Sequence, residues 1–189
     1  MEKEFDNSSI IAAWTNILSS LGLDINDPNF KDTPQRIMRS YHELFEGLEK
    51  GDDIEKILSV TFPSEYSGII ACKGVHCWSM CPHHFLPVEY YVDIGYVSNN
   101  KVLGISKLGR IVKLIAKKPM LQEDYTKSLT DIMTKYLDPK GSIILVKGRH
   151  TCMTARGLEQ EDCWTYTSSI AGVFNEHATR EEFMMLLGR

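Results

Sequence analysis

The stretch from residue 88 to residue 97 constrains the fold most, because every second side chain along it is a large apolar or aromatic one. Val88, Tyr90, Val92, Ile94 and Tyr96 occupy these alternate positions. A period of two is typical of a half-buried antiparallel strand that turns one face to the core. Further strands are predicted over residues 68–78, 101–105, 142–152 and 164–174.

Apolar residues recur at helical spacing in the segments on either side of these strands. Thr33 and Pro34 suit the start of one helix, and Ser106 suits the N-cap of another. Helices are predicted over residues 8–21, from 33 onward, from 106 to 118, over 122–137 and over 179–187. The order of elements predicts an α+β protein whose antiparallel sheet carries helices on one side.

The chain has 189 residues, which at roughly 150 residues per domain favours one functional domain. Within it we expect an N-terminal helical segment over residues 1–60 and a catalytic core over residues 61–189. The net charge of −4 argues against a general nucleic-acid binder. We find neither a membrane-spanning run nor a signal peptide, so a cytoplasmic protein is expected.

Two short clusters carry residues that bind soft metal ions. Cys81 and His84 lie three positions apart, and His150 and Cys152 alternate at the predicted end of a strand. On a strand these last two would share a face. Thiolate and imidazole groups are the ligands that zinc prefers, so four candidate zinc ligands result. The alternative is that they are isolated core cysteines and histidines, because free cysteine is usually buried.

The number of ligands separates a structural zinc ion from a catalytic one. A structural ion is closed by four protein ligands, whereas a catalytic one has three and keeps a position for water. Paired CxxC knuckles are absent from the sequence, so we favour three ligands with a spare histidine beside the metal. Such a site lowers the pKa of water from about 15.7 to about 7, and histidine is a suitable acid–base partner.

Basic residues form a second feature. Lys107 and Arg110 lie three positions apart at the start of a predicted helix, where backbone N–H groups favour an anion. Arg156 follows Cys152 closely, and Arg36 and Arg39 belong to an earlier helix. A phosphate-binding role is one interpretation, and a solvated helix face is the other. Gln122 and Glu123 open the next helix, where a carboxylate complements the helix dipole or accepts hydrogen bonds from a purine.

Five motifs, in this order and spacing, resemble the GTP cyclohydrolase I family. They are Asp32-Thr33-Pro34-Gln35-Arg36, residues 79–87 (SMCPHHFLP), residues 103–112 (LGISKLGRIV), Leu121-Gln122-Glu123 and residues 150–157 (HTCMTARG). The resemblance implies the tunnelling fold and a homodecamer of pentameric rings with active sites shared between subunits. It also implies conversion of GTP to 7,8-dihydroneopterin triphosphate and formate, which leads into folate, pterin or deazapurine synthesis.

By the same resemblance, individual residues acquire roles. The implied zinc ligands are Cys81, His84 and Cys152, and the implied catalytic residues are His150, His83 and Ser106. Gln122 and Glu123 would hold the guanine edge. The triphosphate would be held by Lys107, Arg110, Arg156, Arg36 and Arg39.

The sequence departs from the family at Pro82, where a glutamate is usual, and around Cys163 to Thr167, where small residues are usual. These departures motivate a second hypothesis, a tunnelling-fold relative with an altered purine or pterin substrate. A third hypothesis, from a different class, is a catalytically weak homologue that binds nucleotide or a partner subunit and regulates.

Overall fold

The computed structural model describes residues 4–51 and 53–189 of the chain. Four helices come first: α1 (Asn7–Ser20), α2 (Thr33–Leu44), α3 (Glu46–Glu49) and α4 (Asp53–Leu58). The central part contains β1 (Thr61–Pro63), β2 (Ile69–Met80), β3 (Pro87–Val97), β4 (Lys101–Leu103), α5 (Ser106–Ala116), α6 (Gln122–Ile132) and the π-helical turn η1 (Met133–Leu137). The chain ends with β5 (Gly141–His150), α7 (Thr151–Thr154), β6 (Thr165–Gly172), the 3-10 turn η2 (Val173–Asn175) and α8 (His177–Leu186).

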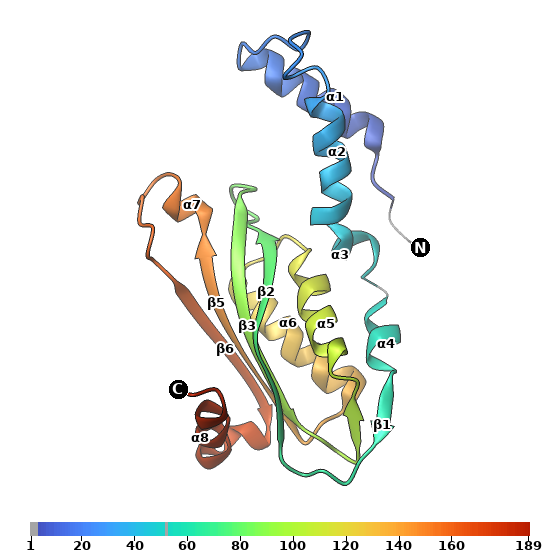
Figure 1. Ribbon diagram of the computed structural model, residues 1–189, viewed down its shortest axis with the longest axis vertical. Helices are drawn as coiled ribbons and strands as arrows, with labels where there is room; N and C mark the ends of the chain where they lie inside the picture. The colour runs from blue at the N-terminus through green and yellow to red at the C-terminus, as the bar shows by residue number, and fades with distance from the viewer. Residues whose placement is uncertain (1–3, 52) are drawn as a thin grey trace.

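The main sheet is antiparallel throughout, with strand order β2-β3-β5-β6. Its register pairs Met80 with Pro87 and Val88 with His150. The end of β2, the start of β3 and the end of β5 therefore meet at the same end of the sheet. This is the end from which α7 projects in Figure 1.

Helices α5 and α6 cover one face of this sheet, α5 against β2 and α6 against β5 and β6 (Figure 1). The buried side of α5 contributes Leu108, Ile111 and Ile115 to the core, as its helical period predicts. The predicted α+β architecture is confirmed.

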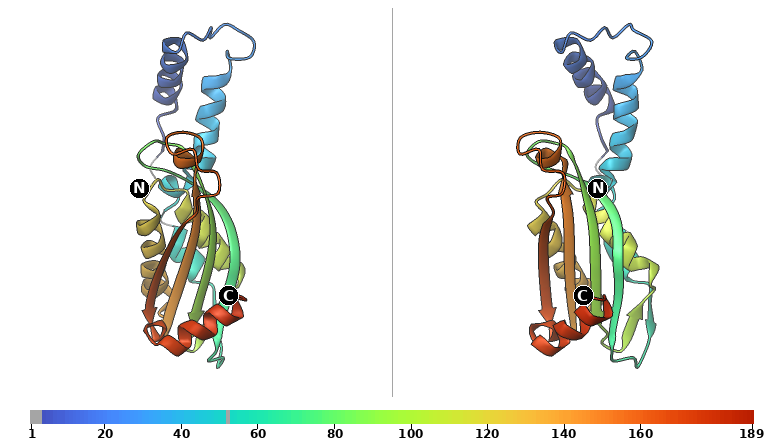
Figure 2. Two further views of the ribbon diagram at one scale, coloured as in Figure 1. Left: turned by 90° about the vertical axis from the view of Figure 1, so that its left-hand side faces the viewer. Right: turned by 60° about the vertical axis from the view of Figure 1, so that its left-hand side comes forward.

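Strand β3 is more buried than its alternation predicts. The second face should be exposed, yet Asp93, Gly95 and Val97 on that face are buried as well. Helix α8 is the cause, since it crosses the opposite face of the sheet (Figure 2). It approaches so closely that a Cβ atom on Gly95 would lie 2.5 Å from Phe183 Cε2.

The segment predicted as a return strand pairs elsewhere. We expected residues 101–105 to run back along the strand before them, but β4 pairs with β1 in a separate two-stranded sheet. Asn100 has a φ of 61°, which turns the chain away from β3. The Leu103 N–H then donates to the buried Tyr96 hydroxyl at 2.8 Å, which fixes β4 over the core.

Two helix starts also differ from expectation. Thr33 is the first residue of α2 rather than its N-cap, and the N-cap Asp32 makes no side-chain capping bond. Ser106 is likewise the first residue of α5, preceded by Ile105. Predicted boundaries commonly err by such one-residue shifts.

Helices α1 and α2 form an antiparallel arm that extends beyond the sheet (Figures 1 and 2). Trp14 Nε1 donates to Tyr41 OH at 3.1 Å, which ties the two helices together. Ile17 and Leu21 remain 43% and 71% exposed, so the arm buries little of its own apolar surface. The expected division into residues 1–60 and 61–189 stays a prediction.

None of the helices in residues 4–51 and 53–189 combines the length and the apolar character that a membrane span requires. The cytoplasmic location expected from the sequence is not tested by this finding and stays a prediction.

The core position of α6 generates a stability prediction. Leu129 is fully buried, so Leu129→Ala should lower the free energy of unfolding by about 2–5 kcal/mol through lost burial and a residual cavity. Leu186→Ala on α8, where the side chain is 58% exposed, is the control and should change it by less than about 0.5 kcal/mol. Urea unfolding at one fixed protein concentration measures both, and equal losses would contradict the core assignment.

Candidate metal centre and active site

Three of the four candidate ligands converge. One donor atom each from Cys81, His84 and Cys152 lies within 4.8 Å of the other two. Cys81 Sγ and His84 Nδ1 are 3.9 Å apart. Cys81 is buried, Cys152 is half-buried and His84 is exposed, so the cluster opens to solvent on one side.

The loop between β2 and β3 holds the first two ligands in a closed turn. The Phe85 N–H donates to the Cys81 carbonyl and the Cys81 N–H donates to the Leu86 carbonyl, both at 2.9 Å. Phe85 itself adopts a φ of 54°, which is unfavourable for a side chain of this size. Its ring lies 5.2 Å from that of Phe45, centroid to centroid, so contact with the helices that precede the sheet stabilises the turn.

Cys152 reaches the cluster by a different route from the one we predicted. We expected His150 and Cys152 to share the face of a strand, but β5 ends at His150 and Cys152 lies in the short helix α7. The helical turn redirects the chain, so the thiol joins Cys81 while His150 stays on the strand. His150 is accordingly outside the group of three.

The donor chemistry of this cluster fits zinc. Two thiols and one imidazole form the soft, three-ligand set that leaves a tetrahedral position open. Burial, followed by the neighbouring Cys81 sulfur, raises the pKa of the Cys152 thiol. A bound cation would relieve this cost of placing two thiolates side by side.

A cavity of about 230 Å³ adjoins the cluster. It is lined by all three candidate ligands and by four further residues with predicted roles, namely His83, Gln122, Glu123 and His150. Residues from three separate segments of the sequence therefore line one concave site, which is the arrangement expected of an active site.

His150 is half-buried and lines this cavity. Its Nε2 atom is 2.9 Å from Gln122 Oε1. Burial lowers the pKa of the His150 imidazole, and the nearby Glu123 carboxylate partly opposes that change. A histidine beside a candidate metal site can act as an acid–base group.

The residues at the start of α5 lie elsewhere in the chain. Lys107 and Arg110 line a second cavity of about 550 Å³, together with Lys50, Lys56, Lys113 and Lys117. A Cβ atom on Gly109 would lie 4.0 Å from Val75. Val75 precedes Cys81 by six residues along β2, which corresponds to about 20 Å of strand. The fold therefore does not bring Ser106, Lys107 and Arg110 to the Cys81–His84–Cys152 group of the same chain.

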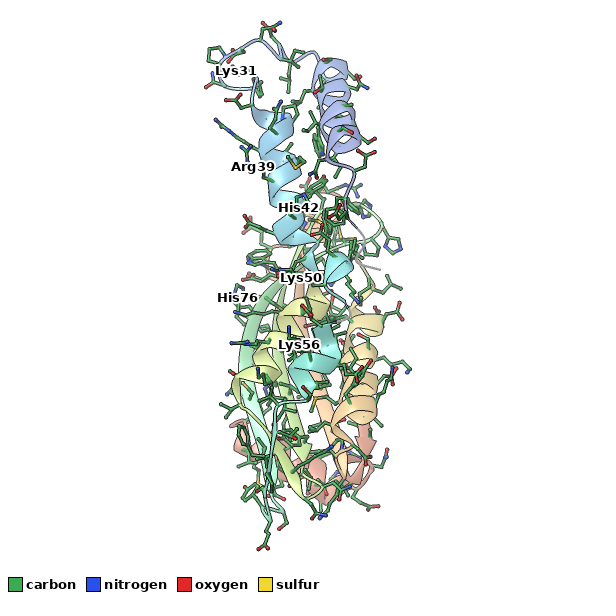
Figure 3. The ribbon with its side chains drawn as sticks, turned by 90° about the vertical axis from the view of Figure 1, so that its right-hand side faces the viewer. Lys31, Arg39, His42, Lys50, Lys56 and His76 are labelled. Carbon is green, nitrogen blue, oxygen red and sulfur yellow. The ribbon has the colours of Figure 1, made fainter. Side chains whose placement is uncertain are left out.

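Of the other three arginines with a predicted phosphate-binding role, one lies near the Cys81–His84–Cys152 group and two lie on the arm. Arg156 lies near the cluster, because its charge acts on the Cys152 thiol. Arg36 and Arg39 lie on α2 of the arm, where Arg36 is paired with Asp32 at 3.8 Å. Figure 3 shows Arg39 on the arm, well above Lys50 and Lys56.

Tyr90 packs beside the site as a buried neighbour of His150, although the sequence indicated only a strand position. Its ring is stacked on Tyr125 at 5.0 Å and meets the His150 ring edge-on at 6.2 Å. Alternation places Tyr90 on the core face, but only the β3–β5 register, which pairs it with Gly148, brings it beside His150.

Comparison with known proteins gives this geometry a context. The family model described as GTP cyclohydrolase I matches residues 10–188. The chain belongs to the GTP cyclohydrolase I family. The tunnelling fold that the resemblance implied is thereby supported by both the architecture and the family.

Relatives within the GTP cyclohydrolase I family match along almost the whole chain. GTP cyclohydrolase 1 of Desulforamulus reducens is 37% identical over 185 residues, which cover 97% of this chain and 98% of that protein. GTP cyclohydrolase 1 of Clostridium perfringens is 38% identical over 171 residues, covering 90% and 91%. The yeast (Saccharomyces cerevisiae) protein of the same name is 34% identical over 180 residues, covering 95% and 74%.

Among solved structures, the apo form of the archaeosine synthase QueF-Like matches with a TM-score of 0.45 and 16% identity. The match covers 58% of this chain and 96% of that one.

The cluster geometry predicts which cysteine the metal requires. Cys152→Ala should reduce bound zinc from about one ion per chain to near none, because two remaining ligands do not form a stable site. Cys77→Ala is the matched control: Cys77 is buried, and its sulfur contacts Tyr125 OH at 3.7 Å instead of joining the cluster. Elemental analysis of the purified variants measures both, and full zinc in Cys152→Ala would refute the ligand assignment.

Proposed function

We propose that the chain is a zinc-dependent enzyme that converts GTP and water to 7,8-dihydroneopterin triphosphate and formate. One observation carries the proposal: in a chain of the GTP cyclohydrolase I family, a Cys81–His84–Cys152 group with zinc-type donors adjoins a cavity that also contains His150. Folate, pterin or deazapurine synthesis would use the product, and the cytoplasm is the proposed location.

Cys81, His84 and Cys152 would hold the zinc ion. When bound, zinc supplies a Lewis acid and a water of lowered pKa. His150 would exchange a proton with the imidazole ring of the purine, a role that its position in the cavity lining supports. His83 is exposed at the cavity wall and would assist ring opening and closure, and Ser106 would assist rearrangement of the sugar.

Glu123 would bind the guanine. Its carboxylate is exposed at the start of α6 and lines the cavity, where it can accept from the N1–H and the exocyclic amine of the base. The triphosphate requires concentrated positive charge on a protein with a net charge of −4. Arg156 near the cluster, Lys107 and Arg110 at α5, and Arg36 and Arg39 on the arm are the proposed contacts.

We propose further that each active site is built from more than one chain. Lys107 and Arg110 lie about 20 Å from the cluster of their own chain by the rise of β2, and they line a different cavity. A neighbouring chain could bring its α5 to the cluster. The sheet supports such an assembly, because β2 and β6 are edge strands within the described part of the chain. Pairing of β2 with β6 of the next copy closes a ring, and two pentameric rings give the proposed decamer.

The activity itself is tested directly. With zinc and GTP, the purified protein should release formate and a product that becomes fluorescent on oxidation. His150→Ala should retain zinc, because His150 lies outside the ligand group, and should lose about 10²–10⁴-fold in kcat. Turnover of a different purine would favour the altered-substrate hypothesis, and zinc binding without turnover would favour the regulatory one.

Shared active sites are tested by mixing two inactive chains. Arg110→Ala and His150→Ala should each be inactive alone, but their co-expression should restore activity, because some sites combine an intact α5 with an intact cluster. Random assembly in equal amounts predicts about a quarter of the wild-type activity per chain. Co-expressed chains that stay inactive, with mixed oligomers verified by two affinity tags, would show that each site uses a single chain.

A further inference from the structure

The Gln122 side chain is buried, and its amide group hydrogen-bonds to other residues of the same chain. Its exposed fraction is 2%. Its Nε2 atom donates to the carbonyl oxygens of Val146 at 3.2 Å and Thr165 at 3.1 Å, and to Thr167 Oγ1 at 3.2 Å. Its Oε1 atom lies 2.9 Å from His150 Nε2. Both amide protons are therefore used, and none is left for a ligand.

The surroundings fix which way round this carboxamide lies. Backbone carbonyl oxygens only accept hydrogen bonds, so the group facing Val146 and Thr165 must be the NH₂ group. A reversed amide would place its oxygen against two carbonyl oxygens and its NH₂ group against His150. Oε1 is consequently the atom that faces the imidazole.

Two threonine hydroxyls support the same orientation. The Thr126 hydroxyl donates its only proton to the backbone carbonyl oxygen of Gln122, at 2.7 Å. At 2.6 Å, Thr167 Oγ1 must then donate to Thr126 Oγ1. Thr167 is left as an acceptor for Gln122 Nε2. The donor and the acceptor of each of these three hydrogen bonds are therefore fixed, and they require Nε2 to face Thr167 and Oε1 to face His150.

An amide oxygen at 2.9 Å from a ring nitrogen requires that nitrogen to carry the proton. We propose that Gln122 is a positioning residue that holds His150 in the Nε2–H form and leaves Nδ1 as the nitrogen that exchanges a proton with substrate. This inference rests on the proposed function for the role of His150. It also replaces the expectation that the Gln122 side chain holds the guanine edge, a task that remains with Glu123.

Gly148, which has no side chain, leaves the space that the contact between Gln122 and His150 occupies. A Cβ atom on Gly148 would lie 2.2 Å from Gln122 Oε1 and 2.9 Å from Tyr90 Cε1. Gly148 pairs with Tyr90 and lies two residues before His150, on the same face of β5. Any larger residue there would push the carboxamide away from the imidazole.

The first test observes the tautomer and needs no turnover. Protein labelled with ¹⁵N-histidine is studied without substrate at about pH 8.5, where histidine is neutral, and the His150 signals are assigned by their loss in His150→Ala. The Nε2–H tautomer is expected, and Gln122→Met should convert it to a mixture with the Nδ1–H form. A wild-type His150 in the Nδ1–H form, or a tautomer unchanged in Gln122→Met, overturns the proposal. If the chain releases no formate from GTP, the proposed function fails and this measurement still stands.

The second test separates positioning from substrate binding. Gln122→Met should lower kcat by about 10²-fold through misplacement of the imidazole, while KM for GTP stays within about twofold. Gly148→Ala should give the same pattern if it folds, and Thr167→Val should give a smaller loss, because two carbonyl acceptors remain. Thr130→Val, a buried site on α6 that contacts neither residue, is the control and should keep full kcat.

A double variant completes the comparison. Because Gln122 acts only through His150, Gln122→Met combined with His150→Ala should cost no more in kcat than His150→Ala alone. A raised KM with unchanged kcat in Gln122→Met, or additive losses in the double variant, would show that the amide contacts substrate and would overturn the proposal.

Discussion

The register between β2, β3 and β5 is the constraint on which the site depends. Met80 pairs with Pro87 and Val88 pairs with His150, so residues distant in sequence lie together at one end of the sheet. A slip of one residue would turn His150 to the other face and separate Cys81 from Cys152. Burial on both faces of β3 makes such a slip costly, because most side chains of either face are already packed, Pro87 and Tyr91 being the exposed ones. The core thus specifies the geometry of a site that itself lies at the surface.

The same arrangement would leave the proposed site incomplete within one chain. The strands run from the Cys81–His84–Cys152 group toward the start of α5, so Lys107 and Arg110 are separated from Glu123, the proposed guanine contact, by about the length of β2. A monomer can shorten that distance only by unfolding the sheet. Two edge strands that pair with no other described strand on their outer side, and the apolar surface of the arm, are instead features that natural proteins cover. Assembly would cover these surfaces and complete the site at once.

The sequence predicted the elements of this fold well because their periodicity depends on local burial. The helices over α1, α2, α5 and α8 and the four strands of the main sheet follow from side-chain spacing alone. The pairing of β4 with β1 did not, since it depends on the Tyr96 hydroxyl and the turn at Asn100, which are contacts across the fold. Cys81, His84 and Cys152 were predicted from residue type and then from resemblance. The reasoning that joined Cys152 to the group was nevertheless wrong, because a strand was assumed where α7 forms.

The hydrogen bond between Gln122 and His150 shows what sequence cannot supply. Both residues were candidates, but a glutamine beside a glutamate at a helix start gives no sign of which one faces a ligand. Burial decides it. The Glu123 side chain is exposed at the cavity, whereas Gln122 turns inward into acceptors from β5 and β6. An uncharged amide suits that place better than a carboxylate would, because a carboxylate would meet two carbonyl oxygens without a donor and would carry an unpaired charge into the core. The two adjacent residues therefore differ in position: Glu123 is exposed at the cavity and is the proposed ligand contact, whereas Gln122 is an internal support.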